Sequence, residues 1–155
     1  MKKIVIMLMS AALLLTSLTS CAPDKPESNP RSPEEIYEKL VESGFFDVAD
    51  SPLMKDISPG RIADYKVEPD LAVSYVAKEA AISSFFVQLL IIEAKEGESG
   101  AVYNAMLEHQ SDLLDETFYP QGRIAAAASI VGRNGNIVYL ICDERAAEIE
   151  TQMFE

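Results

Sequence analysis

Apolar residues recur along the first third of the sequence at a helical spacing. The tetrapeptide at 32–35, SPEE, has the form of a capping box with proline at the first helical position. Apolar side chains follow at helical intervals up to Gly44, which ends the predicted helix. Prolines and a glycine interrupt 49–69, so we expect an irregular segment there, with one short helical turn at 60–65.

Two strands are predicted next. Residues 71–78 alternate between larger and smaller side chains, and 84–94 are almost all apolar, which indicates a central strand buried on both faces. A buried helix would show the same apolar run. One face of 84–94 should pack against a helix at 101–118. We expect 33–48, with its apolar Phe45 and Phe46, to cover the other face. The alternatives are that a partner protein or a hydrophobic ligand covers it.

The last third is expected to hold a hairpin and a helix. Residues 124–132 are interpreted as a strand because Asn134-Gly135 follows between apolar runs, and 137–142 would be the return strand. Asp143 would cap a final helix at 144–154. The predicted order α-β-β-α-β-β-α indicates an α+β fold, with an antiparallel sheet of about four strands covered by helices. The helix at 101–118 would bury one stripe: Val102, Tyr103, Met106, Leu107, Gln110, Leu113 and Leu114.

The N-terminal segment has the pattern of a secretion signal. Two lysines precede a twelve-residue apolar stretch that is short for a membrane span. It ends in Leu18, Thr19, Ser20 and Cys21, which resembles the lipobox of bacterial lipoproteins. That resemblance implies cleavage after residue 20 and a diacylglyceryl group on the Cys21 sulfur, which would anchor the protein to the extracytoplasmic side of the cell membrane. An ordinary signal peptide or a single anchor helix, with Cys21 incidental, is the alternative.

Three parts of the chain follow from this pattern. Residues 1–20 would be the signal peptide, 21–31 the lipidated cysteine and a proline-rich tether, and 32–155 a single domain. The tether would reach about 17 Å as a flexible coil. The formal net charge of −12 argues against nucleic acid as a partner, because phosphate binding needs a basic surface.

The arrangement also resembles a family of clostridial-type lipoproteins that hold the domain of unknown function 4358. The matching parts are the lipobox ending at Cys21, the paired strands at 71–94, the Phe118-Tyr119-Pro120 helix end, and the final strand at 135–140 before an acidic helix. The resemblance spans about 60–155 in addition to the leader. It implies no reaction and no catalytic residues.

Candidate reactive side chains are few. Cys142 sits in an apolar strand next to two acidic residues that would raise its pKa, so we interpret it as a buried hydrophobe rather than a nucleophile. His109 lies on the flank of the helix stripe, and no serine or cysteine is placed to need a general base, so we interpret it as a half-buried flank residue. Motifs for phosphate loops, serine hydrolases and zinc proteases do not occur, so no cofactor, no metal and no enzymatic activity are predicted. The sequence also holds two sets of neighbouring acidic residues, and we interpret each as a solvated surface rather than a calcium site. One set is Asp112, Asp115 and Glu116, and the other is Glu93, Glu96 and Glu98.

Two functions from different classes remain. The first is a non-enzymatic, membrane-anchored module that binds a protein or another envelope component, with an envelope protein as a possible partner, through a sheet face or edge. The second is a lipoprotein that binds a small ligand or a cation in a pocket between sheet and helices. A hydrolase built around His109 is a third, weaker hypothesis.

Overall fold

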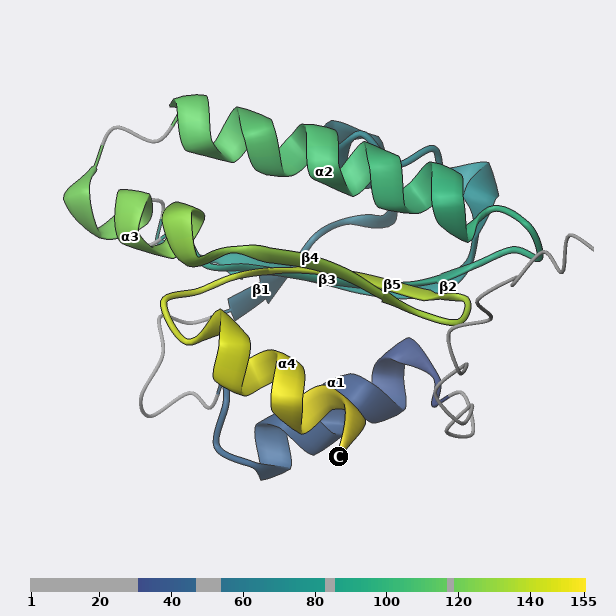
Figure 1. The fold of residues 1–155 in the computed structure, drawn as a ribbon, viewed down its shortest axis with the longest axis horizontal. Helices are drawn as coiled ribbons and strands as arrows, with labels where there is room; N and C mark the ends of the chain where they lie inside the picture. Colours follow the sequence, from purple (N-terminus) through teal and green to yellow (C-terminus); the bar gives the residue numbers. More distant parts are fainter. Residues whose placement is uncertain (1–30, 47–53, 83–85, 117–118) are drawn as a thin grey trace, which may run out of the picture.

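In a computed structural model, the chain forms a five-stranded antiparallel sheet between two layers of helices (Figure 1). The structure describes residues 31–46, 54–82, 86–116 and 119–155. The strand order is β1-β2-β3-β5-β4. The strands are β1 (Met54–Asp56), β2 (Ala72–Ala80), β3 (Gln88–Ala94), β4 (Ile130–Asn134) and β5 (Ile137–Cys142). The helices are α1 (Pro33–Glu42), α2 (Ser99–Glu116), α3 (Pro120–Ala128) and α4 (Ala146–Phe154), with short 3-10 turns η1 (Pro59–Tyr65) and η2 (Pro69–Leu71).

The predicted α+β class and antiparallel sheet are confirmed. The capping box at the start of α1 is present in both directions: the Glu35 amide donates to Ser32 Oγ at 3.2 Å, and the Ser32 amide donates to Glu35 Oε2 at 3.0 Å. The predicted short helical turn is η1. The asparagine–glycine hairpin is also present, with Gly135 and Asn136 as the two loop residues and a φ of 62° at Gly135, as a hairpin turn requires.

Strand β3 is the buried centre of the sheet. Leu89 and Ile91 point into a cluster formed with α1 and α4, while Leu90 and Ile92 point into a second cluster formed with α2, α3 and η1. All four side chains are fully buried, and each contributes about 1.5–3 kcal/mol relative to exposure. The second face is therefore covered within the chain, partly by Phe46 as predicted and partly by α4.

Four predictions about the elements are wrong. The sheet has five strands rather than about four, because β1 is a three-residue strand of mixed polarity with no apolar alternation to reveal it. Residues 124–128 belong to helix α3 and not to a strand. Pro120 at the start of α3 and a run of alanines favour the helix, and the strand begins only at Ile130. The third error is the start of the central strand, which begins at Gln88 because Phe86, with a φ of 49°, and Val87 lie outside it. Residues 83–85 lie outside the described part of the chain.

The fourth error concerns the start of α4. Arg145 occupies the N-cap position, and no side chain caps it. Asp143 stands two residues earlier, where its Oδ1 accepts the Arg145 amide at 2.8 Å and its backbone carbonyl accepts the Ala146 amide at 3.1 Å. Asp143 thus fixes the turn into α4 rather than the helix end itself.

Helix α2 buries only three of the seven residues of the predicted stripe. Val102, Met106 and Leu113 are buried as expected. Leu107 and Leu114, however, are 39% and 53% exposed, and they lie on the flank of α2 that also carries Tyr103 and Gln110. Gln110 fixes the direction of this flank, because its amide donates to the Ser129 carbonyl at 2.8 Å, just before β4. The flank therefore points toward the β4 side of the sheet.

Gly132 and Tyr139 are paired across β4 and β5, and only glycine fits there. A β-carbon on Gly132 would overlap the ring of Tyr139, which is 5% exposed and whose hydroxyl donates to Glu150 Oε1 at 2.7 Å. The ring covers the glycine, tilts against Phe154 and ties β5 to α4. Moving the ring would break both contacts.

We therefore expect Gly132→Ala to lower the free energy of unfolding by about 1–3 kcal/mol through overpacking. Urea denaturation of residues 22–155 measures this. Gly100→Ala is the matched control, because a β-carbon there meets only Arg133 Nη1 at 4.0 Å and the helix favours alanine. Equal stability of Gly132→Ala and the wild type would contradict the packing.

Candidate functional site

The residues predicted for lipidation, Leu18 to Cys21, lie outside the described residues, as does the tether. Among the residues that the structure describes, no helix is long and apolar enough to cross a bilayer.

Cys142 is a buried structural residue, as predicted. Its side chain is fully buried in β5, and Sγ donates to the Phe86 carbonyl at 3.1 Å. Burial, with a further contribution from the charge of Asp143, raises the pKa of the Cys142 thiol to about 12. A thiol with this pKa is not a nucleophile at neutral pH.

His109 is buried between α2, η1 and β3. Its Nε2 lies 2.9 Å from Gln88 Oε1, and its ring meets the Tyr65 ring edge-on at a centroid distance of 5.0 Å. Burial lowers the pKa of His109; Asp112 opposes the shift, and the charge of Lys66 adds to it. Neither Asp112 nor Lys66 makes a hydrogen bond to the ring. His109 is thus a neutral packing residue that holds α2 to the sheet.

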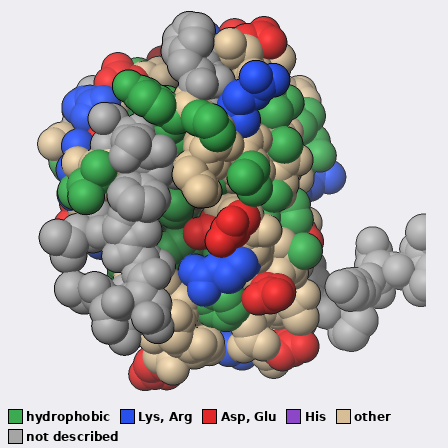
Figure 2. Space-filling model, turned by 90° about the vertical axis from the view of Figure 1, so that its left-hand side faces the viewer, with side chains coloured by type: hydrophobic (Ala, Val, Ile, Leu, Met, Phe, Trp, Pro, Cys, Tyr) green, Lys and Arg blue, Asp and Glu red, His purple; other side chains and the backbone are tan. Residues whose placement is uncertain are grey.

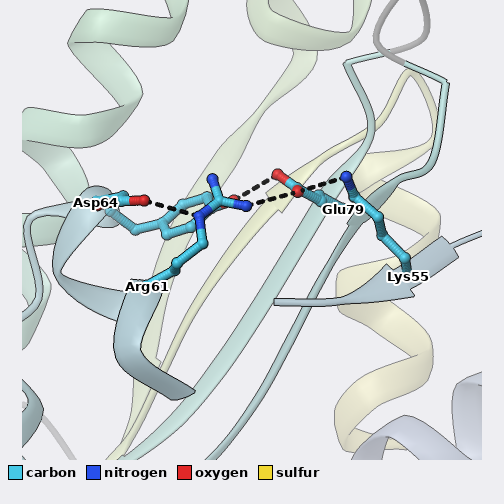
Figure 3. Close-up of polar contacts among 5 residues, drawn as sticks. Lys55, Arg61, Asp64 and Glu79 are labelled. Atoms are coloured by element: carbon cyan, nitrogen blue, oxygen red, sulfur yellow. Dashed lines mark hydrogen bonds and ion pairs between the residues drawn. The ribbon is translucent and has the colours of Figure 1, made fainter. Parts of the chain in front are cut away.

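A polar cluster lies next to His109, where η1 crosses the β1–β2 side of the sheet (Figure 3). Glu79 is its centre, and its carboxylate is held by the Tyr65 hydroxyl at 2.6 Å, by Lys55 Nζ at 3.1 Å and by Arg61 Nη1 at 3.4 Å. Arg61 also pairs with Asp64 at 2.9 Å. Burial alone would raise the pKa of Glu79, but the hydrogen bonds from Tyr65 and Lys55 and the two cations outweigh it and lower the pKa.

The cluster ties three elements together and leaves no charge free. Its two carboxylates and two cations balance, and each carboxylate already has a partner within the chain. A depression of about 210 Å³ beside it is lined by residues that include Lys55, Glu79 and Gln88. Because Glu79 is already neutralised by two cations, this depression offers little attraction to a further cation.

The acidic groups singled out in the sequence are not brought together as a metal site. Asp112 pairs with Lys66 at 2.9 Å. Glu93 accepts hydrogen bonds from Ser74 at 3.0 Å and from Asn136 at 3.1 Å, so it braces the β2–β3–hairpin junction instead of lying in a solvated turn. Within the described ranges, no group of three or more histidine, cysteine or acidic side chains could hold a metal ion.

Strand β4 forms an open edge of the sheet. In Figure 1 the sheet is seen edge-on with β4 toward the viewer, and none of the described segments lies in front of it. Asn134 and Ile137 flank a two-residue loop and form a hydrogen-bonded pair, so bonding to β5 alternates along β4. Val131 and Arg133 therefore direct their backbone N–H and C=O groups outward.

A depression of about 420 Å³ runs along this edge, between β4 and the first half of α2. Gly100, Tyr103 and Asn104 of α2 line one side of it, and Gly132 and Arg133 of β4 line the other. No carboxylate is among these residues. The guanidinium of Arg133 lies beside Gly100 and has no ion-pair partner among the described residues.

Exposed apolar side chains extend the same surface. Leu107 and Leu114 continue along the α2 flank, and Tyr119 and Ile124 of the α3 region are 58% and 51% exposed. Figure 2, which views the molecule from the end that carries α3, shows hydrophobic side chains gathered in the upper half of that face. We call the β4 edge, its depression and the α2 flank (Tyr103, Leu107, Gln110, Leu114) the β4-edge surface.

The sequence contains a signal for this surface in the apolar stripe of α2, which the pattern predicts to be buried throughout. The α2 stripe is wider than the core it can fill, since it holds seven residues on nearly half of the helix circumference. Its excess members, Leu107 and Leu114, are the ones left exposed. Because the sequence predicts a strand over 124–132, it does not indicate that β4 is short or that it lies at an edge of the sheet.

The burial of His109 predicts a pH dependence of stability. The unfolded chain binds a proton on this histidine near pH 6.5, whereas the folded chain binds it only at lower pH, so stability falls as the pH drops from 7 toward 5. His109 is the only histidine in the sequence. Urea denaturation of residues 22–155 at several pH values should show this slope, and His109→Gln should make it shallower. An unchanged slope in the variant would contradict the assignment.

Comparison with protein-family models gave no match, and comparisons with curated proteins and with solved structures gave none either. The resemblance to lipoproteins with the domain of unknown function 4358 therefore stays a prediction. The function has to be argued from the geometry of the domain.

Proposed function

We propose that the protein is a membrane-anchored extracytoplasmic lipoprotein whose domain is a non-enzymatic interaction module that binds a protein at the β4-edge surface. The lipobox pattern supports the anchor, with Cys21 as the lipidated residue and 21–31 as the tether. The open β4 edge supports the binding role, because an exposed edge with outward N–H and C=O groups accepts a further strand.

The observation that carries the proposal is the contrast between the faces and the edge of the sheet. Both faces of the central strand β3 are covered by helices of the same chain, so this part of the sheet offers no face for binding. The β1 edge is only three residues long and carries the charged Lys55 and Asp56, which discourage strand pairing. The β4 edge carries Ile130, Val131 and Gly132 with a single charge at Arg133, and apolar side chains flank it.

A ligand-binding lipoprotein is the rival function. Its best support is the depression beside Glu79, but the carboxylate there already has three partners, which come from β1 and η1. The β4-edge depression, by contrast, has unpaired backbone groups and an unpaired cation among the described residues. The edge is therefore the better candidate for binding.

The anchor is tested by replacing the cysteine. Cys21→Ala should stop acylation and release the protein from the membrane fraction, because the lipid is the proposed attachment. Cell fractionation and metabolic labelling with a fatty acid measure this. Membrane attachment that persists in Cys21→Ala would contradict a lipid anchor and indicate a retained signal helix.

The binding surface is tested with a photo-crosslinking amino acid in the full-length protein in its own membranes. A benzophenone side chain in place of Leu107 should form a discrete protein adduct, whereas the same group in place of Val73 should not. Val73 is a matched control because it is 62% exposed and lies on β2, away from β4.

A second variant tests whether the adduct at Leu107 depends on the free edge of β4. Val131→Pro removes an outward N–H without removing a hydrogen bond to β5, so the domain should stay folded, as circular dichroism can verify. This substitution should abolish the Leu107 adduct. Equal adducts at Leu107 and Val73, or an adduct that survives Val131→Pro, would overturn the assignment to the β4 edge.

A further inference from the structure

The outward backbone groups of β4 are symmetric about Gly132. Val131 and Arg133 lie one residue to either side of it, and both direct N–H and C=O groups out of the sheet. A second β4 strand can be placed antiparallel to the first, with the two Gly132 residues opposite each other. Val131 of each copy then faces Arg133 of the other. Both pairs then exchange backbone hydrogen bonds, so the edge is complementary to itself.

Glycine also suits the position on the axis. In this register the two Gly132 residues form a non-hydrogen-bonded pair, where Cα atoms approach most closely, at about 4.5 Å. A side chain there would already collide with Tyr139 of its own chain. Because neither copy carries a side chain at 132, the close approach meets no obstacle on the α1–α4 side.

The distribution of charge favours this surface, rather than the rest of the molecule, as the place where two copies meet. Two chains of net charge −12 repel each other, so they can meet only where carboxylates are scarce. Strand β4, helix α3 and the α2 flank contain no acidic residue. The charges in β4 and α3 are Arg133 and Arg123, and the nearby Glu150 is engaged by the Tyr139 hydroxyl at 2.7 Å.

The α2 flank completes the match. Helix α2 runs antiparallel to β4, because Gly100 lies near Arg133 and Gln110 near Ser129. The axis at Gly132 therefore passes near Tyr103, whose ring lines the depression. In the paired arrangement, Tyr103 of one copy faces the depression of the other. Side chains that are exposed in a single chain become buried in the pair.

We propose that the partner at the β4-edge surface is a second copy of this chain, joined through antiparallel β4 strands across a two-fold axis at Gly132. The two sheets then form one continuous sheet, with both lipid tethers attached to the same assembly. This inference rests on the proposed function, since it names the partner of the β4-edge surface. The rival occupant is an extended segment of a different protein.

The register is tested by disulfide formation between full-length copies in membranes. Two differently tagged chains, one with Val131→Cys and one with Arg133→Cys, are co-expressed and oxidised. These positions face each other in the proposed register, within the Cα distance that a disulfide allows. Chains that all carry Val131→Cys are the matched control. In the proposed register each Val131 faces Arg133 of the other copy, so the two cysteines of this control lie two residues out of register. The unsubstituted chain controls for Cys21 and Cys142.

Preferential disulfide formation in the mixed pair, several-fold above both controls, is the expected result. Equal crosslinking in the mixed pair and in the Val131→Cys control would overturn the axis at Gly132. No disulfide, together with a Leu107 photo-adduct to a different protein that Val131→Pro abolishes, would overturn the second copy and leave the proposed function intact. No disulfide and no photo-adduct would overturn both.

Discussion

Strand β3 is apolar on both of its faces, and the rest of the architecture follows from this constraint. A strand of this kind is stable only with helices on each side, so Leu90 and Ile92 require α2 while Leu89 and Ile91 require α1 and α4. The covering elements come from the beginning, the middle and the end of the described chain. With both faces of β3 covered, the two edges of the sheet are β1 and β4, and these edges differ in length and charge.

The same constraint explains why the polar side chains are structural. Glu79, Tyr65 and His109 sit where η1 and α2 meet the sheet, and their contacts join elements that apolar packing alone would leave loosely aligned. Saturation of the Glu79 carboxylate stabilises the fold but removes it as a ligand. At the β4 edge the opposite holds, because backbone groups and an arginine have no partner among the described residues.

The parts of the fold that local physics determines could be predicted from the sequence. The capping box at Ser32, the hairpin at Gly135 and the buried run of β3 each have a short-range signature. Strand β1 and the boundary between α3 and β4 could not be predicted in the same way. The first is formed by pairing with a distant strand, and the second divides an apolar run whose two halves take different structures. The β4-edge surface has no short-range signature either, since an edge is a property of strand order.

Amide hydrogen exchange at β4 tests the central claim, that the open edge of the sheet is the binding surface. The amides of Val131 and Arg133 point outward, so they should exchange rapidly in residues 22–155 at high dilution. In the full-length protein in its own membranes they should become strongly protected, while the exchange of β3 stays slow in both states. Equally fast exchange of these two amides in both states would contradict the claim, because it would show that nothing pairs with β4.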